Sequence, residues 1–172
     1  MPVPFFGTLG FSYVGLCFLL CLFIPNIFWA FNQPADKINI RENRVLLVCE
    51  RAGQVLVTAL LPVFSDYNPQ GPEPWLIWLC VAGILTALYL LFWLRYFTGK
   101  HTVRDFYGPL FGIPYPGASL PVAAAFLIGV YGQVYALCIA VLILGVGHVG
   151  IHIQHLKAYK NCASAEKAAR DM

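Results

Sequence analysis

The chain has 172 residues, of which 59% are hydrophobic and only 11% are charged, and its formal net charge is +3. Soluble domains carry about 25% charged residues, so a chain this apolar cannot cover a water-facing surface and is predicted to have lipid as its solvent. Nucleic-acid binding is not expected, because the basic residues lie in short connections between apolar runs. We expect one all-α polytopic membrane domain over residues 1–156 and a cytoplasmic tail over residues 157–172.

The first two apolar runs predict membrane-spanning helices of different character. The run from Leu9 to Phe31 holds no charged residue and is long enough to cross the ~30 Å of hydrocarbon in a bilayer. The run from Val45 to Phe64 contains Glu50 and Arg51, and Gln54 follows Glu50 at a four-residue step. Residues at that step share one side of a helix, and a polar stripe inside a membrane faces other helices or a wet cavity.

The next two apolar runs predict a third span and a broken fourth one. Trp75 to Phe97 forms a span with aromatic residues at both ends, where they suit the membrane interfaces. Phe106 to Tyr131 is apolar but interrupted by glycines and prolines, so we expect an irregular or re-entrant piece as far as Pro116 and a short helix from Ala118 to Tyr131. Such irregular backbone is tolerated at membrane depth only where protein or a water-filled cavity covers it.

A fifth span from Val134 to His155 completes the predicted bundle. All eleven Lys and Arg residues fall in or beside the first connection, the third connection and the tail. The positive-inside rule then predicts that the N-terminus lies outside and the C-terminus lies in the cytoplasm. These features predict a multi-pass protein of the cell membrane.

The last span carries the feature on which the functional interpretation depends. His148, His152 and His155 share one face of this helix, and Glu50 on the second span lies at the same predicted depth as His148, about 10 Å inside the cytoplasmic end. We expect the Glu50 carboxylate to contact His148 or Arg51, because an unpaired carboxylate at that depth costs several kcal/mol. Glu50, His148 and His152 are therefore the candidate catalytic acid/base residues.

Two alternatives to catalysis stay open for the same residues. His148, His152 and His155 are spaced so that they can share a divalent metal, but few further ligands are present and the zincin motif lacks its Glu. A metal is therefore not favoured, and the cofactor is unknown. The structural alternative is a Glu50–Arg51 ion pair that docks the second span, with histidines at headgroup level that bind only water, phosphate or a carboxylate.

Further polar residues ring the same predicted inner mouth and are candidates for binding a substrate. The basic ones equally suit the positive-inside bias and attraction to anionic lipid. The candidates are Arg51, Gln54, Arg95, Arg104, Asp105, Tyr107 and Tyr115.

These observations support three hypotheses about function. The first is an enzyme or lipid-binding protein whose polar Glu/His/Arg pocket opens to the cytoplasmic leaflet and takes a lipid-like or small amphipathic anionic substrate. The second is a proton-coupled or ion transporter. The third is a non-catalytic scaffold or partner subunit that uses small residues for helix contacts. Membrane lipid, a small-molecule substrate and a second copy of the chain are the expected partners.

Overall fold

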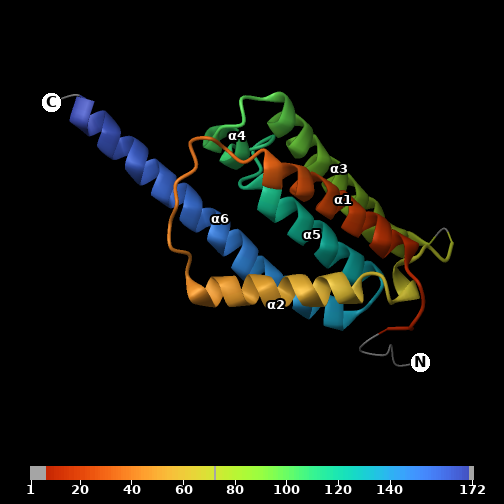
Figure 1. Ribbon diagram of the computed structural model, residues 1–172. Coiled ribbons are helices and arrows are strands. Elements are labelled where there is room, and N and C mark those ends of the chain that lie inside the picture. Colours follow the sequence, from red (N-terminus) through yellow and green to blue (C-terminus); the bar gives the residue numbers. More distant parts are fainter. Residues whose placement is uncertain (1–6, 72, 171–172) are drawn as a thin grey trace.

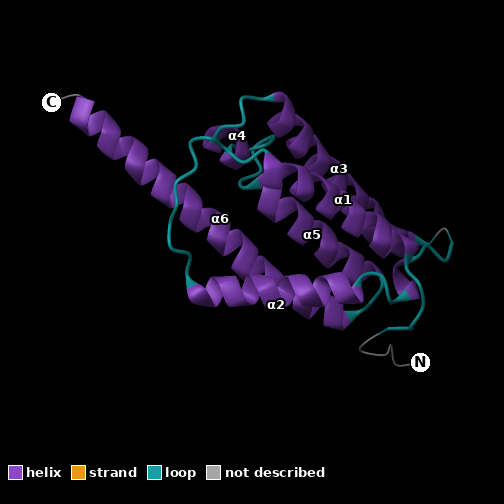
Figure 2. Cartoon of the chain, in the orientation of Figure 1, coloured by secondary structure: helices purple, strands orange, loops and turns teal. Residues whose placement is uncertain are grey.

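The computed structural model describes residues 7–71 and 73–170, and 74% of the chain is helical. Figure 1 shows the helices in order, and Figure 2 shows that the connections between them are loops and turns, without a strand in the described part of the chain. The elements are α1 (Tyr13–Phe31), α2 (Arg44–Leu60), the 3₁₀ turns η1 (Ser65–Tyr67) and η2 (Pro74–Leu76), α3 (Ile77–Thr98), α4 (Val103–Tyr107), α5 (Pro116–Tyr131) and α6 (Tyr135–Arg170).

Within the described residues, three helical segments are long and apolar enough to cross a membrane: Tyr13–Phe31, Pro74–Thr98 and Tyr135–Ala165. α2 and α5 have 17 and 16 residues. At 1.5 Å per residue both are about 25 Å long, which is less than the ~30 Å of a bilayer core. An all-helical fold suited to a membrane is therefore supported, whereas the five-span arrangement and the orientation of the termini stay predictions.

Several predicted boundaries are corrected by the structure. The N-terminal end of α1 and the C-terminal end of α2 are each four residues shorter than predicted. The cause is that residues 8–12 pair with residues 62–65. The Gly10 N–H donates to the Val63 carbonyl at 2.9 Å, and the Leu9–Phe64 bridge lies beside this hydrogen bond. Ser12 then caps α1 by accepting a hydrogen bond from the Gly15 N–H. The predicted break in the fourth apolar run is confirmed, since α5 begins at Pro116.

The tail predicted beyond residue 156 is not separate from the last helix, because α6 runs unbroken for 36 residues. Its C-terminal part projects past the other helices (Figure 1). No glycine or proline follows Gly150, and the Ala- and Lys-rich composition has high helix propensity. The helix therefore continues where the apolar sequence ends.

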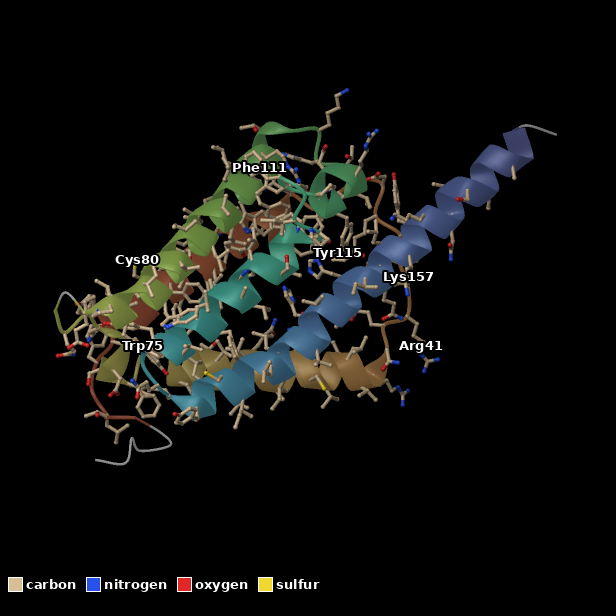
Figure 3. All side chains as sticks on the ribbon, turned by 180° about the vertical axis from the view of Figure 1, so that it is seen from behind. Arg41, Trp75, Cys80, Phe111, Tyr115 and Lys157 are labelled. Atoms are coloured by element: carbon tan, nitrogen blue, oxygen red, sulfur yellow. The ribbon has the colours of Figure 1, made fainter. Side chains whose placement is uncertain are left out.

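The helices form a bundle that is closed at one end and open at the other. α5 packs between α3 and α6, and α2 packs on α6. The pairing of residues 8–12 with 62–65 joins α1 and α2 at one end, and the two helices diverge from there toward the other end (Figure 1). Figure 3 places the basic residues Arg41 and Lys157 at the open end and Trp75 at the closed end.

Backbone contact between α2 and α6 sets the position of the site. A Cβ atom at Gly147 would lie 2.2 Å from the Glu50 nitrogen and 2.6 Å from the Leu46 carbonyl oxygen. Only a residue without a side chain permits this approach, which is the means by which small residues bring membrane helices together. The crossing puts Glu50 beside the residue that follows Gly147, namely His148.

An aromatic cluster supports the open end of the bundle. Phe92, Trp93 and Tyr96 of α3 are buried and pack against the ring of Phe106 in α4, at centroid distances of 5.5 to 6.0 Å. The fourth apolar run therefore begins with a short helix that folds back onto α3 before α5 starts. This arrangement brings Phe106 and its neighbour Tyr107 against the histidine face of α6.

Candidate functional site

The centre of the site is a hydrogen bond between α2 and α6. His148 Nδ1 lies 2.6 Å from Glu50 Oε1, and the two side chains are 24% and 13% exposed. The predicted contact between Glu50 and His148 is confirmed. Because Glu50 holds Nδ1, the nitrogen of His148 that is left for a ligand is Nε2, which has no hydrogen-bond partner among the described residues.

Arg51 does not form the alternative ion pair with Glu50. Its Nη1 donates to Gln54 Oε1 at 3.3 Å, one turn further along α2, and the side chain is exposed. The polar stripe predicted on this helix therefore forms, but its carboxylate is paired with a histidine and not with the adjacent arginine. The guanidinium keeps most of its five N–H donors available.

His152 lies beside His148 and is held by aromatic rings. The ring centroids of the two histidines are 4.7 Å apart. His152 also packs against Phe106 at 5.6 Å and against Tyr107 at 5.5 Å, both from α4. Its position next to the Glu50–His148 pair agrees with the expectation that the two histidines share one face, while its catalytic role stays a prediction.

A second His–Glu pair fastens the connection between α1 and α2. His155 Nε2 lies 2.9 Å from Glu42 Oε1. Beside it, Gln154 accepts a hydrogen bond from the Asn43 N–H and donates one to the Arg41 carbonyl, each at 3.1 Å. The connection thus lies along α6 next to the histidine face. Glu42 was not among the predicted site residues, because nothing in its local sequence distinguishes it from other loop carboxylates.

These side chains line a polar cavity of about 380 Å³ at the open end of the bundle. Its wall comes from all six α-helices and from the first connection, and it brings together most of the predicted site residues. The polar and charged lining includes Lys37, Glu42, Glu50, Arg51, Gln54, Tyr107, His148, His152 and His155.

A larger apolar cavity of about 630 Å³ adjoins the polar one. It is lined by α1, α2, α3, α5 and α6, mostly through aliphatic side chains. The two cavities share four lining residues, which are Asn26, Gln54, Gly117 and His148. The sequence offered no sign of this second space, because it lies between helices whose separation depends on how they cross.

Four predicted substrate-binding residues do not line either cavity. Arg95 donates to the carbonyls of Pro109 at 2.7 Å, Gly108 at 3.0 Å and Asp105 at 3.1 Å, so its guanidinium closes the turn after α4. Arg104 is exposed, and Tyr115 lies just before α5 with a φ of 49°. A contact of Arg95 with a substrate stays a prediction, and in this structure its donors bind backbone carbonyls that fold over the end of α3.

The fourth of these residues, Asp105, caps α4. Its N–H donates to Thr102 Oγ1 and its carboxylate accepts from the Thr102 N–H, both at 3.1 Å. Hydrogen bonds from the Thr102 backbone and side chain lower the pKa of Asp105, and the backbone of Lys100 and the charge of Arg95 act in the same direction. This reciprocal capping explains why a carboxylate stands at the third position of so short a helix.

We predict that this cap weakens in acid. A folded-state pKa below the unfolded value means that the stabilisation is present above the unfolded pKa and is lost as the pH falls through the folded pKa, which for an Asp is below about pH 4. The melting temperature of Asp105→Asn, measured in detergent, should be lower than wild type at pH 7, and the difference should shrink below pH 4. A difference that stays constant with pH would show that the charge of Asp105 is irrelevant.

The three histidines do not form a metal site in this arrangement. Within the described residues, no group of three or more His, Cys, Asp or Glu side chains is arranged to hold a metal ion. The reason is that His148 turns to Glu50 while His155, two helical turns away, turns to Glu42. A shared metal at His148, His152 and His155, which the sequence left open but did not favour, gains no support from this geometry.

The candidate site is thus a polar cavity with a His–Glu pair at its boundary with an apolar cavity. No protein-family model matches the chain, and no curated protein or solved structure shows significant similarity to it. Its function is therefore argued from the geometry of the site.

Proposed function

We propose that the chain is a membrane-embedded enzyme that binds the polar head of an anionic amphipathic molecule in the polar cavity and uses His148 as an acid/base. The observation that carries this proposal is the 2.6 Å contact between His148 Nδ1 and Glu50 Oε1 at the junction of a polar and an apolar cavity. Paired ionisable groups within a membrane domain are a functional-site hypothesis by default, because burying them is costly.

The balance of charges in the polar cavity favours an anionic head group. The two carboxylates, Glu42 and Glu50, are each hydrogen-bonded to a histidine. The two cations are bound only to neutral amides: Arg51 to Gln54 at 3.3 Å and Lys37 to Gln33 at 2.9 Å. A phosphate or carboxylate would complement these cations, and a guanidinium can bind such a group through two parallel N–H donors.

The His148–Glu50 pair suits proton transfer at that head group. A carboxylate on Nδ1 orients the imidazole and stabilises its protonated form, which leaves Nε2 to take a proton from a hydroxyl or a water molecule and return it. Glu50 is then a positioning residue and His148 the catalytic one. His152, whose ring is 4.7 Å away, borders the same space.

The cytoplasmic location of the site is part of the proposal. The polar cavity lies at the open end of the bundle, which is also the end that carries the basic residues of the first connection and of α6 (Figure 3). Under the positive-inside rule this end faces the cytoplasm. The head group would then lie among those of the cytoplasmic leaflet.

Removing the cavity's arginine tests the head-group assignment. We expect Arg51→Gln to lower the occupancy of copurified anionic lipid about tenfold or more, the equivalent of losing one charge-assisted contact. The matched control is Arg44→Gln, which removes the same charge from the same helix at an exposed position outside both cavities. Native mass spectrometry of the purified proteins measures the occupancy, and equal losses in both variants would contradict the proposal.

The two other hypotheses receive less support. A transporter needs a path to both sides, but beyond the apolar cavity the closed end is filled by Leu61, Phe64 and Tyr67, which are at most 4% exposed. A scaffold protein that catalyses no reaction and binds no small molecule needs no internal cavity, whereas two adjoining cavities are present here. The enzyme hypothesis accounts for both observations.

A further inference from the structure

The apolar cavity has the form of a groove between the two diverging helices. α1 contributes Leu22 and Phe23 to its lining, α2 contributes Val55 and Ala59, and α5 forms its inner wall. Residues 8–12 and 62–65 join α1 to α2 at one end of the groove, and the polar cavity lies at its other end. The groove therefore runs from a closed apolar end to an open polar end.

The groove is accessible from the side that would face lipid. Phe23 and Val55, on opposite sides of it, are 45% and 69% exposed, and the outer surfaces of α1 and α2 carry further exposed apolar side chains. A molecule in the bilayer can thus reach the groove laterally, without passing through water. An apolar slot with such access is filled by apolar chains of the surrounding lipid.

The groove leads directly to the candidate reactive group. His148 lines both cavities, as do Asn26 and Gln54. Asn26 donates to the Tyr89 hydroxyl at 2.9 Å and to the Leu22 carbonyl, so its own donors are already bound within the protein. An occupant that spans both cavities must therefore change from apolar to polar at the level of His148.

We infer that the groove holds the alkyl chain of a single-chain anionic lipid, which enters laterally between α1 and α2 and brings its head group to Arg51 and His148. This inference rests on the proposed function and names its substrate class. One polar cavity adjoins one apolar slot of about 630 Å³, a volume within the ~300–1,000 Å³ range of sites for small ligands. The slot ends where Leu61, Phe64 and Tyr67, each at most 4% exposed, fill the closed end of the bundle.

The protein contains its own reporters for this lipid, since Trp29 and Trp93 both line the polar cavity. Stearic acid with a nitroxide near its carboxyl end quenches indole fluorescence at short range. We expect saturable quenching of the wild-type protein, reversed by unlabelled stearate, with the uncharged methyl ester binding about tenfold or more weakly because it lacks the charge that Arg51 binds.

A pair of variants on α2 tests the place of the chain. Ala59 lines the groove and is exposed, so Ala59→Phe fills the slot without disturbing the core, and the apparent affinity for the labelled stearate should fall about tenfold or more. Ala52→Phe is the matched control, because Ala52 is also exposed on α2 but lines neither cavity, and its affinity should stay at the wild-type value.

The outcomes separate this inference from the proposed function. Equal affinities of Ala59→Phe and Ala52→Phe would overturn the assignment of the groove to the lipid chain, while the head-group site would still stand if Arg51→Gln loses binding. Displacement of labelled stearate by diacyl phosphatidic acid as effectively as by stearate would overturn the single-chain assignment. If Arg51→Gln and Arg44→Gln bind lipid equally well but Ala59→Phe blocks quenching, the proposed head-group site is contradicted. The assignment of the lipid chain to the groove would still stand.

Discussion

Replacing Glu50 by Gln is expected to abolish turnover while the protein stays folded. The amide can still hydrogen-bond to His148 Nδ1, which lies 2.6 Å from the carboxylate, so the α2–α6 contact is kept. The charge that stabilises a protonated imidazole is lost, and with it the contribution of general acid/base catalysis, about a hundredfold or more. The measurement compares, by mass spectrometry, lipid extracts of cells that express the wild-type protein or the variant.

Two readouts distinguish catalysis from a structural role for Glu50. Native mass spectrometry should show that anionic lipid still copurifies with Glu50→Gln, because Arg51 is unchanged. The variant would then keep lipid binding while it loses turnover. Glu73→Gln makes the same substitution in an exposed loop at the opposite end of the bundle and should behave as wild type. Loss of folded protein in Glu50→Gln, in proportion to its loss of turnover, would instead indicate that the pair only docks α2.

Replacing Gly147 by Ala is expected to cause a large loss of stability through a single added methyl group. The new Cβ would lie 2.2 Å from the Glu50 nitrogen, and a backbone atom cannot move aside as a flexible side chain does. α2 and α6 must separate, at a cost of about 1–3 kcal/mol for overpacking. The melting temperature in detergent should fall by several degrees, on the order of 5 °C.

Gly83→Ala is the matched control for this substitution. Gly83 lies within α3, and a Cβ atom there would meet nothing within 4 Å. Since alanine is the better helix former, the control should be as stable as wild type or slightly more so. If Gly147→Ala has the same melting temperature as Gly83→Ala, α2 and α6 are not in backbone contact. The geometry of the Glu50–His148 pair would then have to be revised.

The residues that the sequence brought together correctly are those whose depth follows from helical geometry alone. Glu50 and His148 lie at similar distances from charged residues that mark the same end of the bundle, and the rise per residue of a helix is constant. Their level was therefore predictable, and their contact is confirmed. That Arg51, next to Glu50, pairs with Gln54 and not with Glu50 was left open, because either rotamer is compatible with the helix.

Arg95 lines neither cavity, for a reason that also applies to Asp105 and Tyr115. All three lie in or beside the connection between α3 and α5, which folds into α4 and a turn that its own polar groups stabilise. A charged residue beside an irregular segment can serve a ligand or the backbone of that segment. Only the path of the backbone decides between them, and here three carbonyl oxygens surround the guanidinium.

Three features could be predicted from the residues alone: a helical chain suited to lipid, an irregular segment that ends where α5 begins, and a carboxylate and an imidazole at one level. These properties depend on composition and on distances along single helices. The divergence of α1 and α2 around an apolar groove and the hydrogen bond between Glu42 and His155 could be seen only in the folded structure. Such features depend on crossing angles, which backbone contacts such as that of Gly147 with Glu50 set between residues far apart in the chain.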